Sequence, residues 1–417
     1  MRILIVIHQF FPEYASGTER VALNIARMAQ RAGHHIRVLA CTVDPEKSGG
    51  TVTDMPVKGA LETVYQGLSV TFIPRSVLPA TADISLDVDE DLVKSLADWM
   101  QQERFDVAHV MHTMRMGSAV LAAQRCGLPY VLTLTDFFLP CARINLVNLK
   151  NKPCAGPDKG RRCAQDCSTA PWTAPAYLGR FEQTQALLQA AGARIAPSQY
   201  VADRYREAFE GAEIQVIPHG VDLLALSAAT VPPSGTDTPK AQLEIVFIGT
   251  IIPQKGLDIL LKALALLPAA PVKLKVIGGF HGNSAYHDEV RSLAGTDARI
   301  EFTGALEAPE VFRVLSQAGL LCLPSRVPES FSLVLHESAV AGVPALVSDL
   351  GAPAQQVATH DCGQVVAAGN PKAWAAAISA LIEKPDTLKA WKRNLFLPQR
   401  IEEEAFFYGS IYQRLRR

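Results

Sequence analysis

Two glutamates with seven residues between them are the side chains of this chain best suited to bind a sugar diphosphate. Glu329 lies in a loop before a predicted helix, and Glu337 lies on the body of that helix. Free backbone N–H groups and the positive end of the helix dipole favour phosphate at such an N-terminus. A carboxylate on either side can accept sugar hydroxyls. The alternative is a capped, solvent-facing helix with ordinary acidic residues.

A lysine that follows an earlier predicted strand could neutralise the same diphosphate. Gly249 and Thr250 end that strand, and Lys255 stands just before Gly256, near the start of the next helix. Open parallel sheets bind ligands at the carboxyl ends of their strands, so a cation there is well placed for a phosphate. The alternative is a surface lysine ahead of a capping glycine.

The first half of the chain offers a glycine and two histidines. Gly17 opens the first predicted helix, where a residue without a Cβ lets backbone approach a phosphate. His109 and His112 lie at the carboxyl end of a predicted strand, so one of them could face a sugar. The alternative for each histidine is a place in the core. The segment 218–222, which contains His219, is most simply a turn.

Short apolar runs alternate with helical patterns, which indicates parallel sheets wrapped by helices. Helices are predicted at 16–32, with Gly33 as the cap, and at 89–102, 116–125 and 177–189. The turn formers of 231–239 predict a loop. Strands are predicted at 3–8, 36–40, 70–74, 107–111, 130–134 and 194–196, and again at 214–217, 244–248, 273–277, 300–302, 320–323, 345–348 and 363–366.

The length of 417 residues suits two large domains. We therefore expect an α/β fold with two Rossmann-like, doubly wound domains. The first covers residues 1–213 and the second covers residues 214–395. An amphipathic helix within residues 396–417 is expected to pack back onto the first domain.

Composition argues against two classes of partner. The 40 Lys plus Arg nearly balance the 41 Asp plus Glu, so no global field recruits nucleic acid or an anionic membrane. No run approaches the roughly 20 apolar residues that cross a bilayer, and the apolar start is too short for a signal peptide. We expect a cytoplasmic protein, at most peripheral at the inner face of the membrane through aromatics such as Phe137 and Phe138.

Four of the eight cysteines, Cys141, Cys154, Cys163 and Cys167, bunch in a loop of the first domain. Twelve, eight and three residues separate them, which is not the paired spacing of most zinc ribbons. Disulfides are disfavoured in a reducing cytoplasm, so a tetrahedral soft cation could organise the four thiolates. The favoured interpretation of these four cysteines is a structural zinc site, and the alternatives are an iron–sulfur cluster and free thiols or disulfides.

Taken together, these segments resemble family-four retaining glycosyltransferases of the GT-B architecture, in the subset with a cysteine-bearing insertion in the N-terminal domain. The resemblance covers nearly the whole chain. The matching segments are 16–19, 106–112, 196–198, 218–222, 249–256, 302–304, 324–325, 329–337 and 341–344. It implies two domains facing across a cleft, with a nucleotide-diphosphate sugar held mostly by the second and the acceptor by the first. The implied reaction is hexosyl transfer, with retention of configuration, to a glycan or lipid-linked acceptor. By analogy, the pathway is bacterial surface polysaccharide synthesis.

The resemblance also assigns roles to individual residues of the second domain. Glu337 would hold the ribose hydroxyls, and Glu329 would hold hydroxyls of the transferred sugar. Lys255 would meet the diphosphate, aided by the backbone of Ser332 and Leu333.

Other implied roles fall on the first domain, and the chain departs from the family pattern at three positions. Gly17 would approach the diphosphate, and His112, or with less support His109, would sit near the sugar of the nucleotide. No catalytic divalent metal is expected, because cations and helix dipoles stabilise the leaving diphosphate. Thr250 stands where the family commonly has arginine, so one phosphate-binding cation is missing. The other departures are Ser332 in place of glycine and Met111 in place of histidine.

Three other functions compete with sugar transfer. A sugar-nucleotide epimerase would use the same double-Rossmann plan, and a phosphorylase would need a pyridoxal lysine that is not evident. A catalytically inactive, zinc-stabilised binding protein is the third, and Thr250 is the feature in its favour. A dehydrogenase is disfavoured, because the first strand does not lead into a Gly-x-Gly-x-x-Gly turn.

Overall fold

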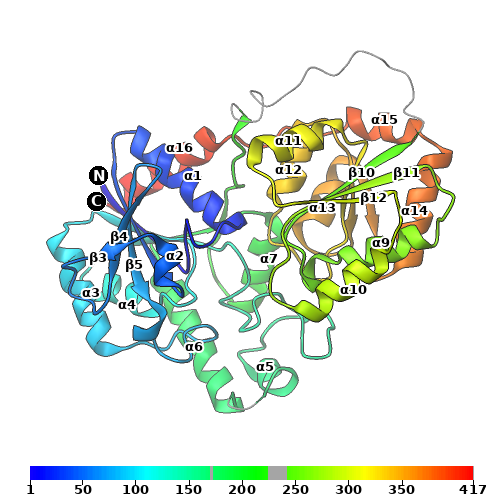
Figure 1. Cartoon of the computed structure of the whole chain (residues 1–417). Coiled ribbons are helices and arrows are strands. Elements are labelled where there is room, and N and C mark those ends of the chain that lie inside the picture. The colour runs from blue at the N-terminus through cyan, green and yellow to red at the C-terminus, as the bar shows by residue number, and fades with distance from the viewer. Residues whose placement is uncertain (170–171, 224–241, 417) are drawn as a thin grey trace. The chain divides into compact units, whose positions relative to one another are not determined.

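The computed structural model describes residues 1–169, 172–223 and 242–416, so the loop predicted at 231–239 lies outside the described residues. The chain forms two compact units (Figure 1). Unit 1 comprises Met1–Gly220 and Ile401–Arg417, and unit 2 comprises Val221–Arg400. Each unit has its own sheet covered by helices, so the prediction of two α/β domains with parallel sheets is confirmed.

Unit 1 is built on a sheet with the strand order β3-β4-β5-β2-β1-β6-β7-β8-β9 within the described residues. All pairs are parallel except β3 with β4 and β4 with β5. The inner strands are runs of Ile, Leu and Val buried on both faces, as parallel sheets require. The strands are β1 (Arg2–Ile7), β2 (His35–Thr42), β3 (Thr51–Val52), β4 (Leu61–Tyr65), β5 (Leu68–Pro74), β6 (Val107–Val110), β7 (Tyr130–Thr133), β8 (Ala193–Ala196) and β9 (Gln215–Val216).

Helices follow the strands of unit 1 close to their predicted positions. Ser16 and Glu19 form a capping box at the start of α1, and Gly33, with φ of +84°, follows its end as predicted. The helices are α1 (Gly17–Arg31), α2 (Pro45–Ser48), η1 (Arg75–Val77), α3 (Glu90–Gln102), α4 (Gly117–Arg125), α5 (Arg161–Asp166), α6 (Ala174–Ala190), α7 (Gln199–Ala208) and α16 (Ile401–Leu415).

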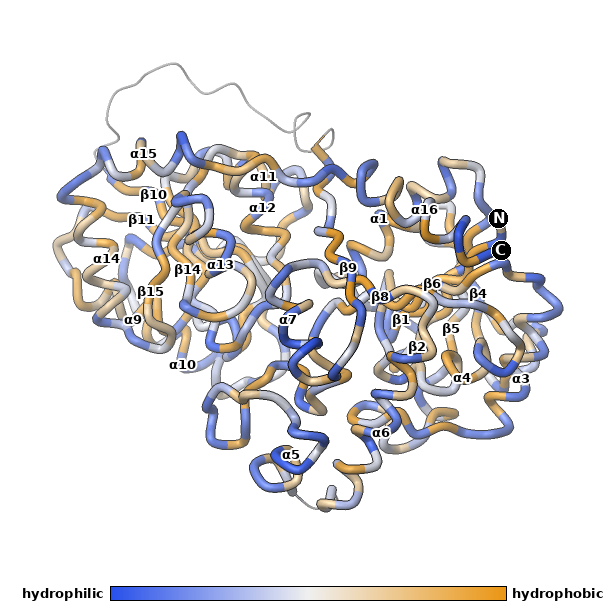
Figure 2. The backbone as a smooth tube through the Cα atoms, turned by 180° about the vertical axis from the view of Figure 1, so that it is seen from behind, coloured by the Kyte–Doolittle hydropathy of each residue, from blue (hydrophilic) through white to orange (hydrophobic). Residues whose placement is uncertain are grey.

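Unit 2 has a wholly parallel sheet with the order β12-β11-β10-β13-β14-β15. Its strands are β10 (Leu243–Ile248), β11 (Val272–Ile277), β12 (Ile300–Gly304), β13 (Leu320–Leu323), β14 (Ala345–Ser348) and β15 (Gly363–Val366). Its helices are η2 (Pro253–Lys255), α9 (Leu257–Ala265), α10 (Ser284–Ala294), α11 (Ala308–Gln317), α12 (Leu333–Val340), α13 (Gly351–His360), α14 (Pro371–Glu383) and α15 (Asp386–Arg393). Hydrophobic stretches run along the strands of both sheets (Figure 2).

Two predictions were wrong. The strand predicted at 214–217 was assigned to the second sheet, but β9 pairs with β8 at the edge of the first. Phe137 and Phe138 were offered as exposed membrane contacts, yet each is 1% exposed and belongs to the core of unit 1. The bend and turn at 136–140, shortly after β7, place both rings in that core.

Helix α16 returns to unit 1, as predicted, and is held by buried polar contacts. Tyr412 OH lies 2.6 Å from Nδ1 of His109 in β6, and Tyr408 OH lies 2.8 Å from Oγ1 of Thr133 in β7. Glu404 is also buried. Its carboxylate accepts from Gly220 N at 2.8 Å and lies 2.9 Å from Nδ1 of His219, so the predicted simple turn at 218–222 is in fact an anchor for α16.

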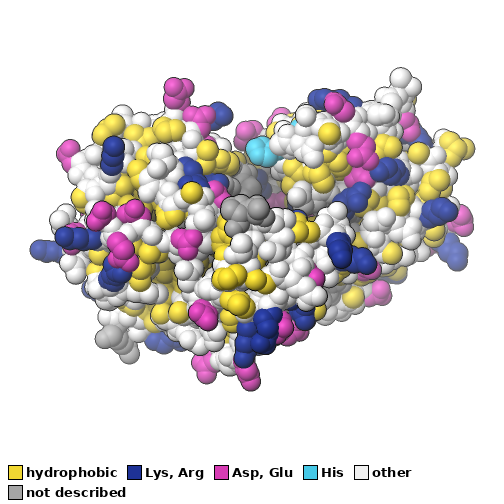
Figure 3. Space-filling view, turned by 90° about the horizontal axis from the view of Figure 1, so that it is seen from below, with side chains coloured by type: hydrophobic (Ala, Val, Ile, Leu, Met, Phe, Trp, Pro, Cys, Tyr) yellow, Lys and Arg dark blue, Asp and Glu magenta, His cyan; other side chains and the backbone are white. Residues whose placement is uncertain are grey.

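Acidic and basic side chains are interspersed on the face shown in Figure 3, in keeping with the near balance of charge. Within the described part of the chain, no helix is both long enough and apolar enough to span a bilayer.

Candidate active site

The predicted site residues of unit 2 gather at the carboxyl ends of β10 and β13. These two strands are neighbours, and the sheet extends from them in opposite directions, to β11 and β12 on one side and to β14 and β15 on the other. Open α/β sheets bind ligands at such a switch point, where adjacent loops turn apart. Lys255 follows β10, and Glu329 follows β13.

Lys255 and Glu329 form an ion pair at this point. Lys255 Nζ donates to Glu329 Oε1 at 2.9 Å, and Ser325 Oγ donates to the same oxygen. The side chain of Glu329 is 12% exposed and that of Lys255 is 37% exposed, so the ammonium remains open to a ligand while its partner is largely enclosed. One oxygen that accepts two bonds fixes the carboxylate, which leaves Oε2 for a hydroxyl.

Helix α12 begins beside Glu329. Ser332 is its N-cap, accepting from Leu335 N at 3.4 Å, and Leu333 is its first residue. The backbone N–H groups of the first turn have no partner within the helix and carry the positive end of its dipole. Glu337 lies on the body of α12 and is half-buried. The start of α12 thus follows closely after Glu329, whose carboxylate binds Lys255.

Close backbone approaches shape the loops that carry these residues. A Cβ on Gly256 would lie 2.0 Å from Pro324 O, and one on Gly278 would lie 2.0 Å from Gly249 O. Glycine at 256 therefore lets the loops after β10 and β13 pack together, and glycine at 278 does the same for the loops after β10 and β11. Thr250, which stands in place of the arginine of the family pattern, is exposed just beyond Gly249.

A buried carboxylate braces the lysine loop, and sequence reasoning missed it. Asp258 is 1% exposed in its side chain and accepts from Tyr286 OH at 3.0 Å, from Lys262 Nζ at 3.1 Å and from Arg326. Burial would raise the pKa of Asp258, but the charge of Arg326 and these hydrogen bonds hold it below its usual value. Arg326 N also donates to Gln254 O at 2.8 Å, which ties η2 to the loop after β13. In the sequence, the sign of this role was a single carboxylate, Asp258, inside an apolar helical run.

The predicted residues of the first half lie in unit 1. Gly17 is the exposed first residue of α1. His109 is fully enclosed, with Nε2 2.7 Å from Thr133 Oγ1, and burial, followed by the charge of His219, lowers its pKa to about 3. His109 is therefore a core residue. His112 lies just past β6, with Nε2 2.6 Å from Oδ2 of Asp136.

His112 belongs to a buried polar group at the switch point of unit 1, between β1 and β6. The ring centroids of His8 and His112 lie 4.0 Å apart, and Nε2 of His8 lies 3.8 Å from Glu19 Oε1. Burial, followed by the charges of His112 and Arg115, lowers the pKa of His8 well below its usual value. Sequence reasoning gave no role to His8, Glu19 or Asp136. What they share in the sequence is a polar side chain at or just after the end of a predicted strand, or in the first turn of a predicted helix.

The structure does not support zinc at the four clustered cysteines. In the described ranges, no three His, Cys, Asp or Glu side chains form a group that could hold a metal ion, and all eight cysteines are free thiols. Burial, with the neighbouring thiols, raises the pKa of Cys163 to about 12, and burial also raises the pKa of Cys141 and Cys167. Metals bind the thiolate, so a metal ion would have to displace the protons of these buried thiols.

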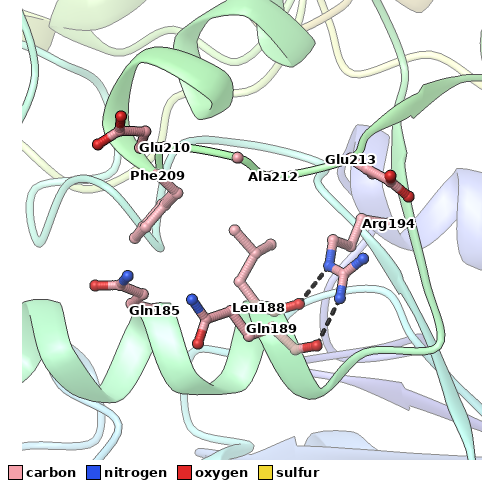
Figure 4. A pocket seen from close by; sticks show the side chains of 9 residues that line it. Gln185, Leu188, Gln189, Arg194, Phe209, Glu210, Ala212 and Glu213 are labelled. Carbon is pink, nitrogen blue, oxygen red and sulfur yellow. Dashed lines mark hydrogen bonds between the residues drawn. The ribbon is translucent and has the colours of Figure 1, made fainter.

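A surface pocket of about 200 Å³ in unit 1 contains none of the predicted site residues (Figure 4). It lies between the end of α6 and the turn after α7. Arg194 donates to the carbonyls of Leu188 and Gln189 at 2.5 Å each and so satisfies the C-terminal carbonyls of α6. This arginine serves the helix terminus.

Comparison with known proteins decides the family. The family described as Glycosyltransferase Family 4 matches residues 15–223, and the one described as Glycosyl transferases group 1 matches residues 234–396. The chain belongs to glycosyltransferase family 4. The protein is thus a glycosyltransferase, and the resemblance drawn from its sequence is confirmed at this level.

Relatives of this glycosyltransferase include enzymes named for inositol-containing substrates. It is 25% identical over 400 residues to phosphatidyl-myo-inositol mannosyltransferase of Mycolicibacterium smegmatis, covering 94% of this chain and 86% of the relative. It is 26% identical to D-inositol 3-phosphate glycosyltransferase of Jonesia denitrificans, covering 75% and 72%.

Solved structures share the fold. The TM-score is 0.70 with sucrose-phosphate synthase of Thermosynechococcus elongatus, at 16% identity over 99% of this chain and 98% of that one. It is 0.67 with HepE of Anabaena in complex with UDP-glucose, at 18% identity over 100% and 98%.

Proposed function

We propose that this glycosyltransferase moves a hexosyl group from a nucleoside-diphosphate sugar to a glycan or lipid-linked acceptor, with retention of anomeric configuration. The observation that carries the proposal is the grouping of Lys255, Glu329 and the start of α12 at the switch point of unit 2. An ammonium and a helix N-terminus favour a diphosphate, and two glutamates favour hydroxyls.

Each residue takes a part in this proposal. Lys255 and the N–H groups at Ser332 and Leu333 stabilise the negative charge that grows on the leaving diphosphate, so that the protein's own cations and dipoles do this work. Glu329 holds hydroxyls of the transferred sugar, and Glu337 holds those of the ribose. In unit 1, Gly17 is the proposed contact of a phosphate and His112 that of a sugar.

The names of the relatives and neighbours support the choice of substrates. HepE was solved with UDP-glucose, so UDP-sugars are the first donors to test, followed by GDP- and ADP-sugars. Phosphatidyl-myo-inositol mannosyltransferase is named for a lipid acceptor, which supports a lipid-linked acceptor for this chain. WaaG, a structural neighbour with a TM-score of 0.63, is described as involved in lipopolysaccharide biosynthesis, and we propose a surface polysaccharide pathway here too.

The central test is Glu337→Ala. Losing a carboxylate that accepts two hydroxyls should weaken binding of the nucleotide sugar by at least about 100-fold, because hydrogen bonds to charged groups contribute about 1.5–3 kcal/mol each. Calorimetry with the UDP-, GDP- and ADP-sugars measures this loss, and circular dichroism checks the fold. Glu383→Ala, at an exposed glutamate of α14 in the same unit, is the matched control. Unchanged affinity in Glu337→Ala would contradict the assigned role.

The stereochemical part has a separate test. Proton NMR of the first-formed product should show the anomeric configuration of the sugar in the nucleotide donor. The opposite configuration would overturn retention and leave the sugar-transfer assignment intact. Interconversion of donor sugars without an acceptor would instead identify an epimerase.

A further inference from the structure

The hydrogen bonds around His112 define which of its nitrogens carries the proton. Met114 N donates to His112 Nδ1 at 3.1 Å, and a backbone N–H can only donate, so Nδ1 must be the unprotonated acceptor. Nε2 then carries the hydrogen and donates to Asp136 Oδ2 at 2.6 Å. This tautomer is assigned from its partners. Both nitrogens are engaged, and the His112 side chain is only 3% exposed.

Asp136 is itself held in place from three directions. Its Oδ1 accepts from Phe138 N at 2.8 Å, and its carbonyl accepts from Tyr205 OH at 2.8 Å. The next residues are pinned by Arg180, a buried arginine of α6 that donates to Leu139 O at 2.8 Å and to Phe138 O. The Arg180 guanidinium also lies 4.8 Å from the centroid of the Phe138 ring. A side chain fixed so closely suits a positioning role.

We propose that Asp136 is a positioning residue for sugar transfer, which fixes His112 as the Nε2–H tautomer and holds the plane of its ring. The proposal rests on the proposed function, in which His112 faces the transferred sugar. An imidazole bonded in this way does not act as a general base in this state, since neither nitrogen has a free lone pair. It instead presents a fixed dipole, whose direction the Asp136 charge maintains.

An amide at position 136 cannot satisfy both neighbours. If the amide oxygen of Asp136→Asn accepts from Phe138 N, the new NH₂ group faces His112 Nε2, and the ring must move its proton to Nδ1, against the Met114 N–H. If the amide is turned over, the NH₂ group faces Phe138 N instead. Either arrangement brings two hydrogen-bond donors face to face. Asp136→Asn should therefore disturb either the tautomer of His112 or the turn at Phe138. Asp136→Ala removes the acceptor without adding an opposing donor.

The experiment measures the tautomer and the kinetics separately. Nitrogen-15 NMR of histidine-labelled protein, with His112→Gln to assign the signal, should show Nε2–H in the wild type and a shifted or mixed state in Asp136→Asn. With a UDP-sugar donor, Asp136→Asn should lower kcat about 10-fold or more, at least as much as Asp136→Ala. KM for the nucleotide sugar should change less than about 3-fold, since the residues proposed to hold its ribose and diphosphate, Glu337 and Lys255, lie in unit 2. Asp98→Asn, at an exposed carboxylate of α3, should match the wild type in both readouts.

Several outcomes would overturn the proposal. An Nδ1–H signal in the wild type would do so, as would Asp136→Asn with a wild-type kcat and tautomer. If Asp136→Asn fails to fold, Tyr205→Phe decides, because it removes only the bond to the Asp136 carbonyl and should broaden the His112 signal and lower kcat modestly. If the wild type transfers no sugar, the proposed function fails on its own, while the NMR measurement still tests the tautomer assignment.

Discussion

Gly351 shows how one residue without a side chain can place a functional glutamate. Its φ is +77°, and a Cβ there would lie 2.4 Å from Glu329 N and 2.5 Å from Glu329 O. The two backbones form a parallel bridge, and Ala352 N donates to Glu329 O at 2.8 Å. The backbone of Glu329 thus packs directly against that of Gly351. In this position the Glu329 carboxylate bonds to Lys255.

Gly351→Ala should therefore displace Glu329. A left-handed φ costs an alanine roughly 1 kcal/mol or more, and the steric conflict with backbone adds about 1–3 kcal/mol. Thermal unfolding measures the stability, and calorimetry should show weakened binding of the nucleotide sugar.

Gly342→Ala provides the control for that prediction. Gly342 has φ of +74° and nothing within 4 Å of its Cβ position, so its substitution carries the backbone strain without the conflict. It should cost only about 1 kcal/mol and leave affinity unchanged. Equal effects of the two substitutions would show that close approach to Glu329 does not matter.

At the scale of elements, α16 and the strands β6 and β7 share a buried hydrogen-bonded network. It joins Tyr412, His109, Thr133 and Tyr408, all of them at most 2% exposed. Each polar group finds a partner on another element, which compensates for the loss of water. The network therefore fixes the position of α16 on the sheet.

The neutral His109 makes the stability of this network depend on pH. Its folded pKa is about 3, while the ordinary value is 6.5, so between these values the unfolded chain binds a proton that the folded chain does not. The contribution of neutral His109 to the free energy of unfolding is fully present above pH 6.5 and falls as the pH drops toward 3. Between pH 8 and pH 5 the loss should be about 2 kcal/mol.

Urea unfolding of the wild type and His109→Gln at both pH values measures this term. The variant loses buried hydrogen bonds and should be less stable than the wild type at pH 8. At pH 5 the difference between their free energies of unfolding should be smaller by about 2 kcal/mol. His35→Gln, at an exposed histidine of β2, controls for the substitution itself. A difference that stays constant with pH would refute the neutral, buried assignment.

At the scale of the whole molecule, the chain leaves unit 1 after Gly220 and returns to it at Ile401. Unit 1 is therefore completed by the last residues of the chain, which bury Ile401, Tyr408, Ile411 and Tyr412. Unit 2 lies between these points and has its own core clusters.

Deleting residues 401–417 should therefore destabilise unit 1 selectively. Each buried apolar or aromatic side chain contributes about 1.5–3 kcal/mol, so the transition of unit 1 should fall by on the order of 10 °C or more. Scanning calorimetry should show this shift, with the transition of unit 2 retained. The exposed substitution Phe406→Ser in the full chain should leave both transitions in place. An unaltered unit 1 after the deletion would contradict the role of α16.

Much of this protein followed from local sequence patterns. The alternation of apolar runs and helical periods predicted both parallel sheets, and Gly33 marked the end of the first helix. The spacing of Glu329 and Glu337 placed one before α12 and one within it, because a helix start depends on neighbouring residues. Such features are determined within about a turn of helix or a strand.

Only the tertiary structure decided which distant groups meet. It put β9 in the first sheet, buried Phe138, enclosed His109 under α16, and brought Asp136 to His112 across 24 residues of sequence. A single sequence gives no direct measure of such pairings, because they depend on strand order and on the return of the last helix. Burial also shifted the titration of these groups: it raises the pKa of Cys163 and lowers that of His109, since a charge taken out of water is costly.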